Sequence, residues 1–333
     1  MNLKKVGAVV SSISLLASLA AVAPAFAHGA KTASHVVKHA KSKPIVIGFV
    51  PGVTTDPFFI SMEYGAQMEA KRLGVQLVYE GGVTYSPSNQ TPYVNAMVAR
   101  KVSALAIAPT DLQAMIPPIR NAVKSKIPVI TVDSTISDTA LLASRITSNN
   151  AQGGAAAADF IGGFARGKGV VAILSPSPGI STDKARVAGF TAELKKKYPH
   201  MQVVVEYDNE QSTQAIQLAQ DLSLRFGNKL VGIFGTDDTS ASGAAEGIRA
   251  SGKLGKVKIV GYDAEPAEVQ DLKQGLISAL IAQKPMEEGM LAVQYAVAAA
   301  KGQKVTKFVQ LANVTITKAN LAKNAQWEYR STM

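Results

Sequence analysis

The chain of 333 residues contains no cysteine and carries a formal net charge of +11 at pH 7. Without cysteine it has no disulfides, no thiol chemistry and no acceptor for an N-terminal lipid. Six lysines and no acids fall in residues 1–43, which leaves 29 basic and 24 acidic side chains, a net +5, in the rest. That is an ordinary surface charge, and no basic stripe interleaved with aromatic residues points to a nucleic-acid partner.

Residues 1–27 have the pattern of a secretory signal. Lys4 and Lys5 precede an apolar stretch that runs to about Leu19, and Ala25-Phe26-Ala27 forms a small-residue cleavage site. An uncleaved membrane anchor is the alternative, because the apolar stretch nearly reaches spanning length. The small residues before the cleavage site favour cleavage. We therefore expect a periplasmic or secreted protein that is soluble once its signal is removed, with no lipid-anchor cysteine.

Residues 28–43 are rich in lysine, histidine, alanine and serine and show no apolar period, which predicts a flexible leader. His35 and His39 are four residues apart and could share a helix face as metal ligands. A leader with scattered histidines is the simpler interpretation, and we predict no metal site.

From Ile45 onward, short β-branched runs alternate with longer helical patterns, which is typical of parallel sheets covered by helices. About 290 residues are large for one core and comfortable for two similar lobes. The predicted fold class is therefore α/β. Strands are expected at 45–50, 75–79, 104–108, 128–132, 169–174, 202–207, 230–234, 257–261 and 276–281. Helices are expected at stretches such as 57–73, 112–125, 150–166, 183–197, 211–226 and 238–251, and Glu265-Pro266 and Lys284-Pro285 also place a proline near a first helical turn.

The segment Asp56-Pro57-Phe58-Phe59 follows the first expected strand and opens a helix. Ligands of α/β sheets bind at the carboxyl ends of the strands. Aromatic faces beside a carboxylate suit a small polyhydroxylated molecule, since the rings pack on C–H groups and the carboxylate accepts from hydroxyls. In the alternative interpretation Asp56 is a helix cap, Pro57 the first helical residue and both phenylalanines belong to the core.

Polar side chains also follow several later strands. Each of them alone is a typical cap or turn residue. Their convergence at one edge of a sheet would indicate a ligand cleft instead. These residues are Asp133, Asp237, Asp238, Asp263 and Gln283.

Little in the chain indicates an enzyme. Residues 162–169 match G-x-x-x-x-G-K, but Gly169 stands where a phosphate loop needs serine or threonine, and the segment runs from a helix to a strand. His200 is the one histidine outside the leader, so the usual general base is nearly absent. We predict no catalytic residue and no cofactor. Paired carboxylates can hydrolyse glycosides without histidine, so an exported glycosidase stays a less favoured alternative.

Over residues 44–316 the chain resembles the periplasmic sugar-binding proteins of ABC importers, type I, and their ribose-binding branch most closely. The resemblance implies two Rossmann-like lobes with parallel sheets, joined by a three-strand hinge and closing around one ligand. It places the N-terminal lobe at 44–147 plus 284–311 and the C-terminal lobe at 148–283 plus 312–333. The motifs that carry it are Asp56-Pro-Phe-Phe59, Ala108-Pro-Thr-Asp111, Ile127-Pro-Val-Ile-Thr-Val-Asp133, Lys184-Ala-Arg-Val-Ala-Gly-Phe190, Gly261-Tyr-Asp263 and Ile281-Ala-Gln283.

The resemblance also implies roles for residues of this chain. Phe58 and Phe59 would pack on a sugar ring. Asp133, Asp263 and Gln283 would form hydrogen bonds with its hydroxyls. The protein would capture a small sugar or polyol as a monomer and deliver it to an ABC permease at the inner membrane. A receptor that feeds a chemotaxis or sensor-kinase system would use the same cleft and remains the alternative.

Departures from the ribose-binding pattern make the expected site acidic. The departing positions are Asp56 and Asp237 in place of asparagine, Lys184 and Ser134 in place of arginine, Ala108 in place of asparagine, and Glu210 near an aromatic lid position. Carboxylates only accept hydrogen bonds, so they favour a ligand rich in donors, such as a polyol or an amino-bearing molecule. Repulsion in a closed cleft disfavours a negatively charged ligand.

Overall fold

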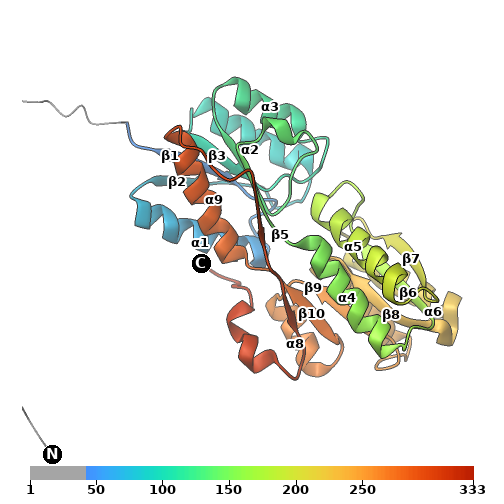
Figure 1. Ribbon diagram of the computed structural model, residues 1–333. Helices are drawn as coiled ribbons and strands as arrows, with labels where there is room; N and C mark the ends of the chain where they lie inside the picture. Colours follow the sequence, from blue (N-terminus) through green and yellow to red (C-terminus); the bar gives the residue numbers. More distant parts are fainter. Residues whose placement is uncertain (1–42) are drawn as a thin grey trace, which may run out of the picture. The chain divides into compact units, whose positions relative to one another are not determined.

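A computed structural model describes residues 43–333 (Figure 1). The predicted signal sequence and almost all of the predicted leader, including His35 and His39, lie outside the described residues. Among the described helices, none has the length and apolar character that a membrane span requires.

Two six-stranded sheets form the framework of residues 43–333. The first has the strand order β11-β5-β4-β3-β1-β2 and all of its pairs are parallel. The second has the order β12-β10-β9-β8-β6-β7, and only β12 runs antiparallel to its neighbour. The strands are β1 Val46–Val50, β2 Gln76–Tyr79, β3 Ala104–Ile107, β4 Val129–Val132, β5 Ser144–Ser148, β6 Val170–Ser175, β7 Gln202–Tyr207, β8 Leu230–Gly235, β9 Lys258–Tyr262, β10 Ala279–Ala282, β11 Phe308–Leu311 and β12 Val314–Ile316.

Helices connect the strands and cover the sheets. Most begin at a polar cap or a proline, as Asp56 and Pro57 do for the first helix. The helices are α1 Pro57–Leu73, α2 Pro87–Ala99, α3 Ile116–Lys124, α4 Asn150–Phe164, α5 Ser181–Lys197, α6 Ser212–Phe226, α7 Asp238–Ala250, α8 Pro266–Gln274 and α9 Pro285–Ala300, with short 3-10 helices at Thr139–Leu141, Gly227–Lys229 and Leu321–Trp327.

The predicted α/β class with two largely parallel sheets is confirmed, and all nine expected strands are present. β5, β11, β12 and α2 were not expected, because the strands are short and partly polar and α2 contains Pro92. The helix expected at 112–125 begins only at Ile116. Asp111 Oδ1 accepts from the backbone N of Gln113 and of Ala114, which forms a turn instead.

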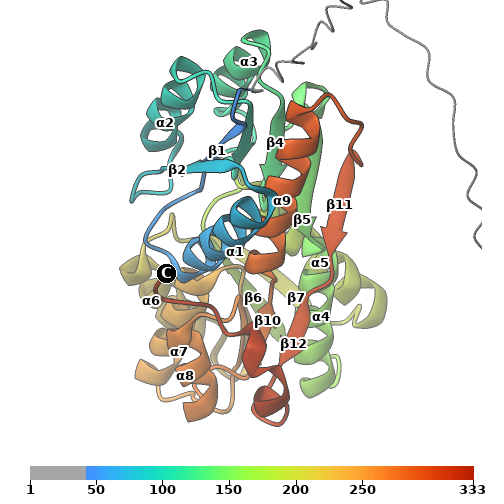
Figure 2. The ribbon, with the colours of Figure 1, turned by 90° about the vertical axis from the view of Figure 1, so that its left-hand side faces the viewer.

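The chain passes between the two sheets three times, at 148–150, 282–285 and 311–314. Figure 2 shows the last of these passages, where β11 leads directly into β12. The three passages match the expected three-segment hinge. The predicted lobe ranges themselves stay a prediction.

Glycines allow two helix pairs to pack at close range. A Cβ on Gly154 of α4 would overlap the carbonyl oxygen of Arg186 on α5, and one on Gly189 would overlap the carbonyl of Ala151. Gly65 of α1 and Gly289 of α9 are related in the same way to Met286 and Met62. The contact between α4 and α5 places the backbone of Arg186 directly against α4.

We expect Gly189→Ala to destabilise the protein by roughly 1–3 kcal/mol, because the added methyl forces α4 and α5 apart. Gly163→Ala is the matched control, since Gly163 is exposed on α4 and an added Cβ has only the Tyr198 hydroxyl, at 3.9 Å, within reach. That control should be neutral or stabilising by up to about 1 kcal/mol. Urea unfolding measures both, and equal stability of Gly189→Ala and wild type would contradict the packing argument.

Candidate functional site

A cavity of about 420 Å³ lies at the carboxyl ends of strands from both sheets. Asp133 comes directly after β4 of the first sheet, whereas Asp263 and Gln283 come after β9 and β10 of the second. Phe58 and Phe59, in the first turn of α1, line the cavity as well. The cavity therefore takes side chains from segments that are far apart in the sequence.

Most of the predicted site residues line this cavity. Their contact with a ligand stays a prediction, but the structure brings their side chains to one place. They are Asp56, Phe58, Phe59, Asp133, Glu210, Asp237, Asp263 and Gln283, and Asp238 joins them.

Lys184 does not line the cavity, and the expectation of a cation at this position needs correction. Its side chain is exposed on α5. Arg186, two residues later, is buried and lines the cavity together with Asp183. Two residues turn a helix by about 200°, so Lys184 and Arg186 point to nearly opposite sides. Asp183, Arg186 and Phe190 are all buried and are separated by steps of three and four residues, which places them on one face of the helix. This spacing was the sequence signal that could have identified Arg186.

Ser134 and Ala108 also lie outside the cavity. Ser134 is buried, its hydroxyl donates to the carbonyl of Pro109 at 2.7 Å, and it borders a second, smaller cavity. Ala108 is fully buried, and its carbonyl accepts from Gln90 Nε2 at 2.7 Å. Because Ser134 and Ala108 form these hydrogen bonds with neighbouring parts of the chain and do not reach the cavity, we no longer assign them to the site.

The start of α1 combines the two interpretations of its sequence, because its residues cap the helix and fill the core and also line the cavity. Asp56 caps the helix, as its Oδ1 accepts from the backbone N of Phe58 at 2.7 Å. Phe58 and Phe59 are almost fully buried, and their rings pack edge to face with centroids 5.1 Å apart. Phe58 also contacts the ring of Tyr329, near the end of the chain, at 5.8 Å. The cap thus holds two rings at the cavity wall.

Asp263 is held by a network that the sequence did not reveal. Its Oδ1 accepts from Gln283 Nε2 at 2.7 Å and from the Tyr329 hydroxyl at 2.8 Å. The same hydroxyl accepts from the backbone N of Gln283 at 2.8 Å. Asp263 also has a positive φ of 96°, as does Asp133 with 62°, a backbone strain that is common at binding sites. Gln283 Oε1 is left buried without a hydrogen-bond partner.

Arg186 is the one base among the described residues that line the cavity. Its Nε donates to Asn150 Oδ1 at 2.8 Å and its Nη1 to the carbonyl of Thr236 at 2.7 Å. The guanidinium lies 3.7 Å from the ring centroid of Tyr262. Asp183 Oδ1 lies 3.6 Å from Nη1 and has no hydrogen-bond partner. The charge is thus held rigidly beneath the cavity.

Seven carboxylates line the cavity, and burial raises the pKa of each. Burial and then the Asp263 charge raise the pKa of Asp56 to about 6. Burial raises the pKa of Asp133 to about 7, against the opposing charge of Arg186. Burial and Asp183 raise the pKa of Asp237 to about 7, and burial with Asp237 raises that of Glu210 to about 10.

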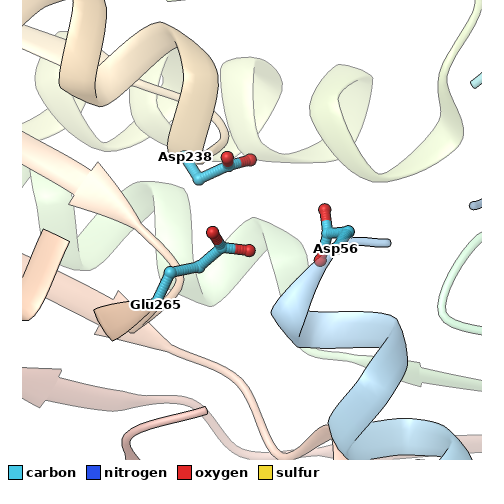
Figure 3. Close-up of side chains that lie close together, drawn as sticks. All are labelled: Asp56, Asp238 and Glu265. Carbon is cyan, nitrogen blue, oxygen red and sulfur yellow. The ribbon is translucent and has the colours of Figure 1, made fainter. Parts of the chain in front are cut away.

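Three carboxylates at helix starts converge beside the cavity (Figure 3). Asp56 begins α1, Asp238 begins α7 and Glu265 caps α8. One oxygen from each lies within 4.8 Å of the others. Carboxylate oxygens are the ligands of hard cations. The positive ends of the three helix dipoles partly offset their mutual repulsion.

We expect the ligand-free protein to lose stability as the pH rises from about 4 to about 7. The folded chain holds protons on Asp133 and Asp237 up to a pKa of about 7, against 3.8 for an ordinary aspartate. This contribution is complete below about pH 4 and is lost as the pH rises through about 7. Melting temperatures across this range measure it.

Asp237→Asn keeps the helix cap but removes the titrating group, so it should flatten this decline and melt several degrees higher than wild type at pH 8. The exposed Asp221→Asn on α6 is the control and should follow wild type. Parallel wild-type and Asp237→Asn curves would show that Asp237 keeps an ordinary pKa.

Residues 47–304 match the family profile described as "Periplasmic binding protein domain". The ribose import binding protein of Bacillus subtilis is 31% identical over 269 residues, which are 80% of this chain and 85% of that protein. A solute-binding protein from Agrobacterium vitis, solved with alpha-D-tagatopyranose, has a TM-score of 0.83 and 33% identity over 86% of this chain and 99% of that one. A solute-binding protein from Agrobacterium radiobacter, solved with D-arabinose, has a TM-score of 0.80 and 30% identity. The match also covers 86% of this chain and 99% of that one.

The family match over residues 47–304 includes every segment that lines the cavity. The described part of this chain has two largely parallel sheets, three connecting segments and a cavity at the carboxyl ends of the strands. The chain belongs to the periplasmic binding protein family, in its ribose-binding-like branch, and has the type I fold.

Proposed function

We propose that this protein binds a small sugar or polyol in the cavity and delivers it to an ABC permease at the inner membrane. The observation that carries the proposal is the cavity itself, which combines two phenyl rings with hydrogen-bonding side chains from both sheets. Rings can pack on the C–H face of a sugar while Asp133, Asp263 and Gln283 bond its hydroxyls.

The relatives support this direction. The Bacillus subtilis protein is named for ribose import, and the two Agrobacterium proteins were solved with a hexose and a pentose bound. They share more than a quarter of their residues with this chain over most of its length. Export through the predicted signal sequence and a monomeric state belong to the same proposal.

The mechanism is capture without a chemical step. A ligand that touches side chains from both sheets stabilises the arrangement in which both reach it, and a permease can recognise that closed form. Asp263 and Gln283 are held by each other and by Tyr329, so little ordering is left for binding. A buried acceptor left unpaired is costly, so analogues that lack one hydroxyl should be rejected strongly.

Thermal unfolding of the mature chain against pentoses, hexoses, pentitols and inositols tests the proposal. A ligand present at about 100 times its dissociation constant adds about 2.7 kcal/mol of stability and raises the melting temperature by several degrees. We expect a stereochemically selective response to one compound and no consumption of that compound. A folded protein that responds to none of these compounds would contradict a sugar or polyol ligand, and turnover would identify an enzyme.

Arg186→Gln should weaken binding of the identified ligand by at least about tenfold, because charge-assisted hydrogen bonds are lost and Asp133, Asp183 and Asp263 lose their counter-charge. Lys184→Gln is the matched control and should stay within about threefold of wild type. Calorimetric titration measures both, and circular dichroism establishes that each is folded. Arg186→Lys keeps the charge but loses the planar fork, so it should fall between them. Equal affinities of Arg186→Gln and Lys184→Gln would remove Arg186 from the site.

A further inference from the structure

Only some of the carboxylates around the cavity have a positive charge beside them. Arg186 lowers the pKa of Asp133, Asp183 and Asp263 against the effect of burial, so these three share one counter-charge. Another group of carboxylates lacks such a partner. This second group, which we call the acidic wall, consists of Asp56, Glu210, Asp237 and Asp238.

Within the acidic wall, burial and neighbouring acids are the causes that raise each pKa. Glu210 is affected by burial, then by Asp237 and Asp183, and Asp238 by burial, then by Asp237 and Asp56. Asp208 adds a further buried carboxylate behind the wall, where its Oδ2 accepts from the Ser240 hydroxyl at 2.6 Å. Around a neutral molecule these carboxyls either repel one another or hold protons, whereas a cation beside them favours their ionised form.

Helix capping explains the presence of some carboxylates of the acidic wall but not of all of them. Asp56 and Asp237 cap α1 and α7, and in each case the recorded backbone contact uses Oδ1. Glu210 caps no helix, and it has a positive φ of 59° next to Asn209 with 54°. A strained turn that presents a carboxylate to a cavity is more readily explained by binding than by stability.

Two further acceptors at the cavity lack partners. Gln283 is 2% exposed and its Oε1 has no hydrogen-bond partner, while its Nε2 is committed to Asp263. Asp183 is 3% exposed and its Oδ1 also has none. Buried acceptors of this kind are normally satisfied, so both point to donors on the bound molecule. These two atoms are independent of the acidic wall and call for a ligand rich in hydrogen-bond donors, which hydroxyl and ammonium groups both supply.

We propose that the ligand is a polyhydroxylated molecule with a protonated amino group, such as an amino sugar, an aminopolyol or an aminocyclitol, and that its ammonium lies against the acidic wall. The inference rests on the proposed function, because it names the class of solute for the same cavity. An ammonium offers three donors and no acceptor, which complements a wall made of acceptors. Its charge also compensates carboxylates that Arg186 does not compensate.

A bare metal ion fits less well. The three oxygens of Asp56, Asp238 and Glu265 have suitable spacing, but Asp56 and Glu265 already accept hydrogen bonds from backbone N–H groups in their caps. Glu210 and Asp237 stand outside that trio. A cavity of about 420 Å³ is also of the size that accommodates a small organic molecule.

The test is calorimetric titration with matched sets that differ at one group. Each set contains a hydroxyl parent, its amine and its N-acetyl derivative: galactose, galactosamine and N-acetylgalactosamine, the glucose series, and myo-inositol with an aminodeoxyinositol and its acetamide. In at least one set we expect the amine to bind about tenfold to a hundredfold more tightly than its parent, the range of a charge-assisted hydrogen bond. Acetylation should abolish the gain.

The variant Asp237→Asn with Asp238→Asn should reduce binding of the preferred amine at least about tenfold, and by a larger factor than binding of its hydroxyl parent. Asparagine keeps the shape and the cap of Asp237 and removes the charge. The exposed Asp221→Asn is the control for a change of charge elsewhere and should leave the preference unchanged. An unchanged preference in the double variant would overturn the assignment of the ammonium to the acidic wall.

The other outcomes separate this inference from the proposed function. If the hydroxyl parents bind as tightly as their amines, the proposal of an amino-bearing ligand is overturned and a neutral sugar or polyol remains as the ligand. Calcium or magnesium chloride that gives the same stabilisation without an amine, reversed by EDTA, would assign the wall to a metal ion and overturn the inference. If no member of any set binds, the inference fails, while the proposed function is decided separately by the wider panel of pentoses, hexoses, pentitols and inositols.

Discussion

The buried guanidinium of Arg186 is the interaction on which the rest of the site depends. It joins α5 to Asn150 on α4, to the backbone after β8 and to the ring of Tyr262 at the end of β9. The Tyr262 hydroxyl in turn accepts from Asn313 Nδ2, which also donates to the carbonyl of Asn149. One side chain thus links the floor of the cavity with two of the three segments that connect the sheets.

Such a burial is favourable only when the charge is fully paired. The pairing depends on the approach of α4 and α5, and that approach depends on the glycines at 154 and 189. Three aspartates then share the charge, and the rest of the acids around the cavity do not. Packing between α4 and α5 therefore determines which carboxylates around the cavity have a counter-charge and which do not.

The C-terminal residues support the site from outside the cavity lining. Tyr329 binds Asp263 and the backbone of Gln283, and its neighbour Arg330 contacts α1 through the Ser61 hydroxyl and the Tyr64 ring. The last segment of the chain therefore spans from the end of β9 to the helix that carries Phe58. A ligand in the cavity meets side chains whose positions this segment fixes.

The class of fold and most of the cavity lining could be predicted from the order of residues in the chain. Strands such as β1 and β6 are buried on both faces and appear as continuous apolar runs, and parallel strands bring their carboxyl ends to one edge, so Asp133, Asp263 and Gln283 could be placed without coordinates. Only the folded chain shows that Arg186 and not Lys184 faces the cavity, that Ser134 and Ala108 serve their own loops, and that Tyr329 holds Asp263 in place. The physical reason is that strand ends follow from local periodicity, whereas the buried side of a helix and the partner of a distant tyrosine depend on which surfaces meet when the chain packs.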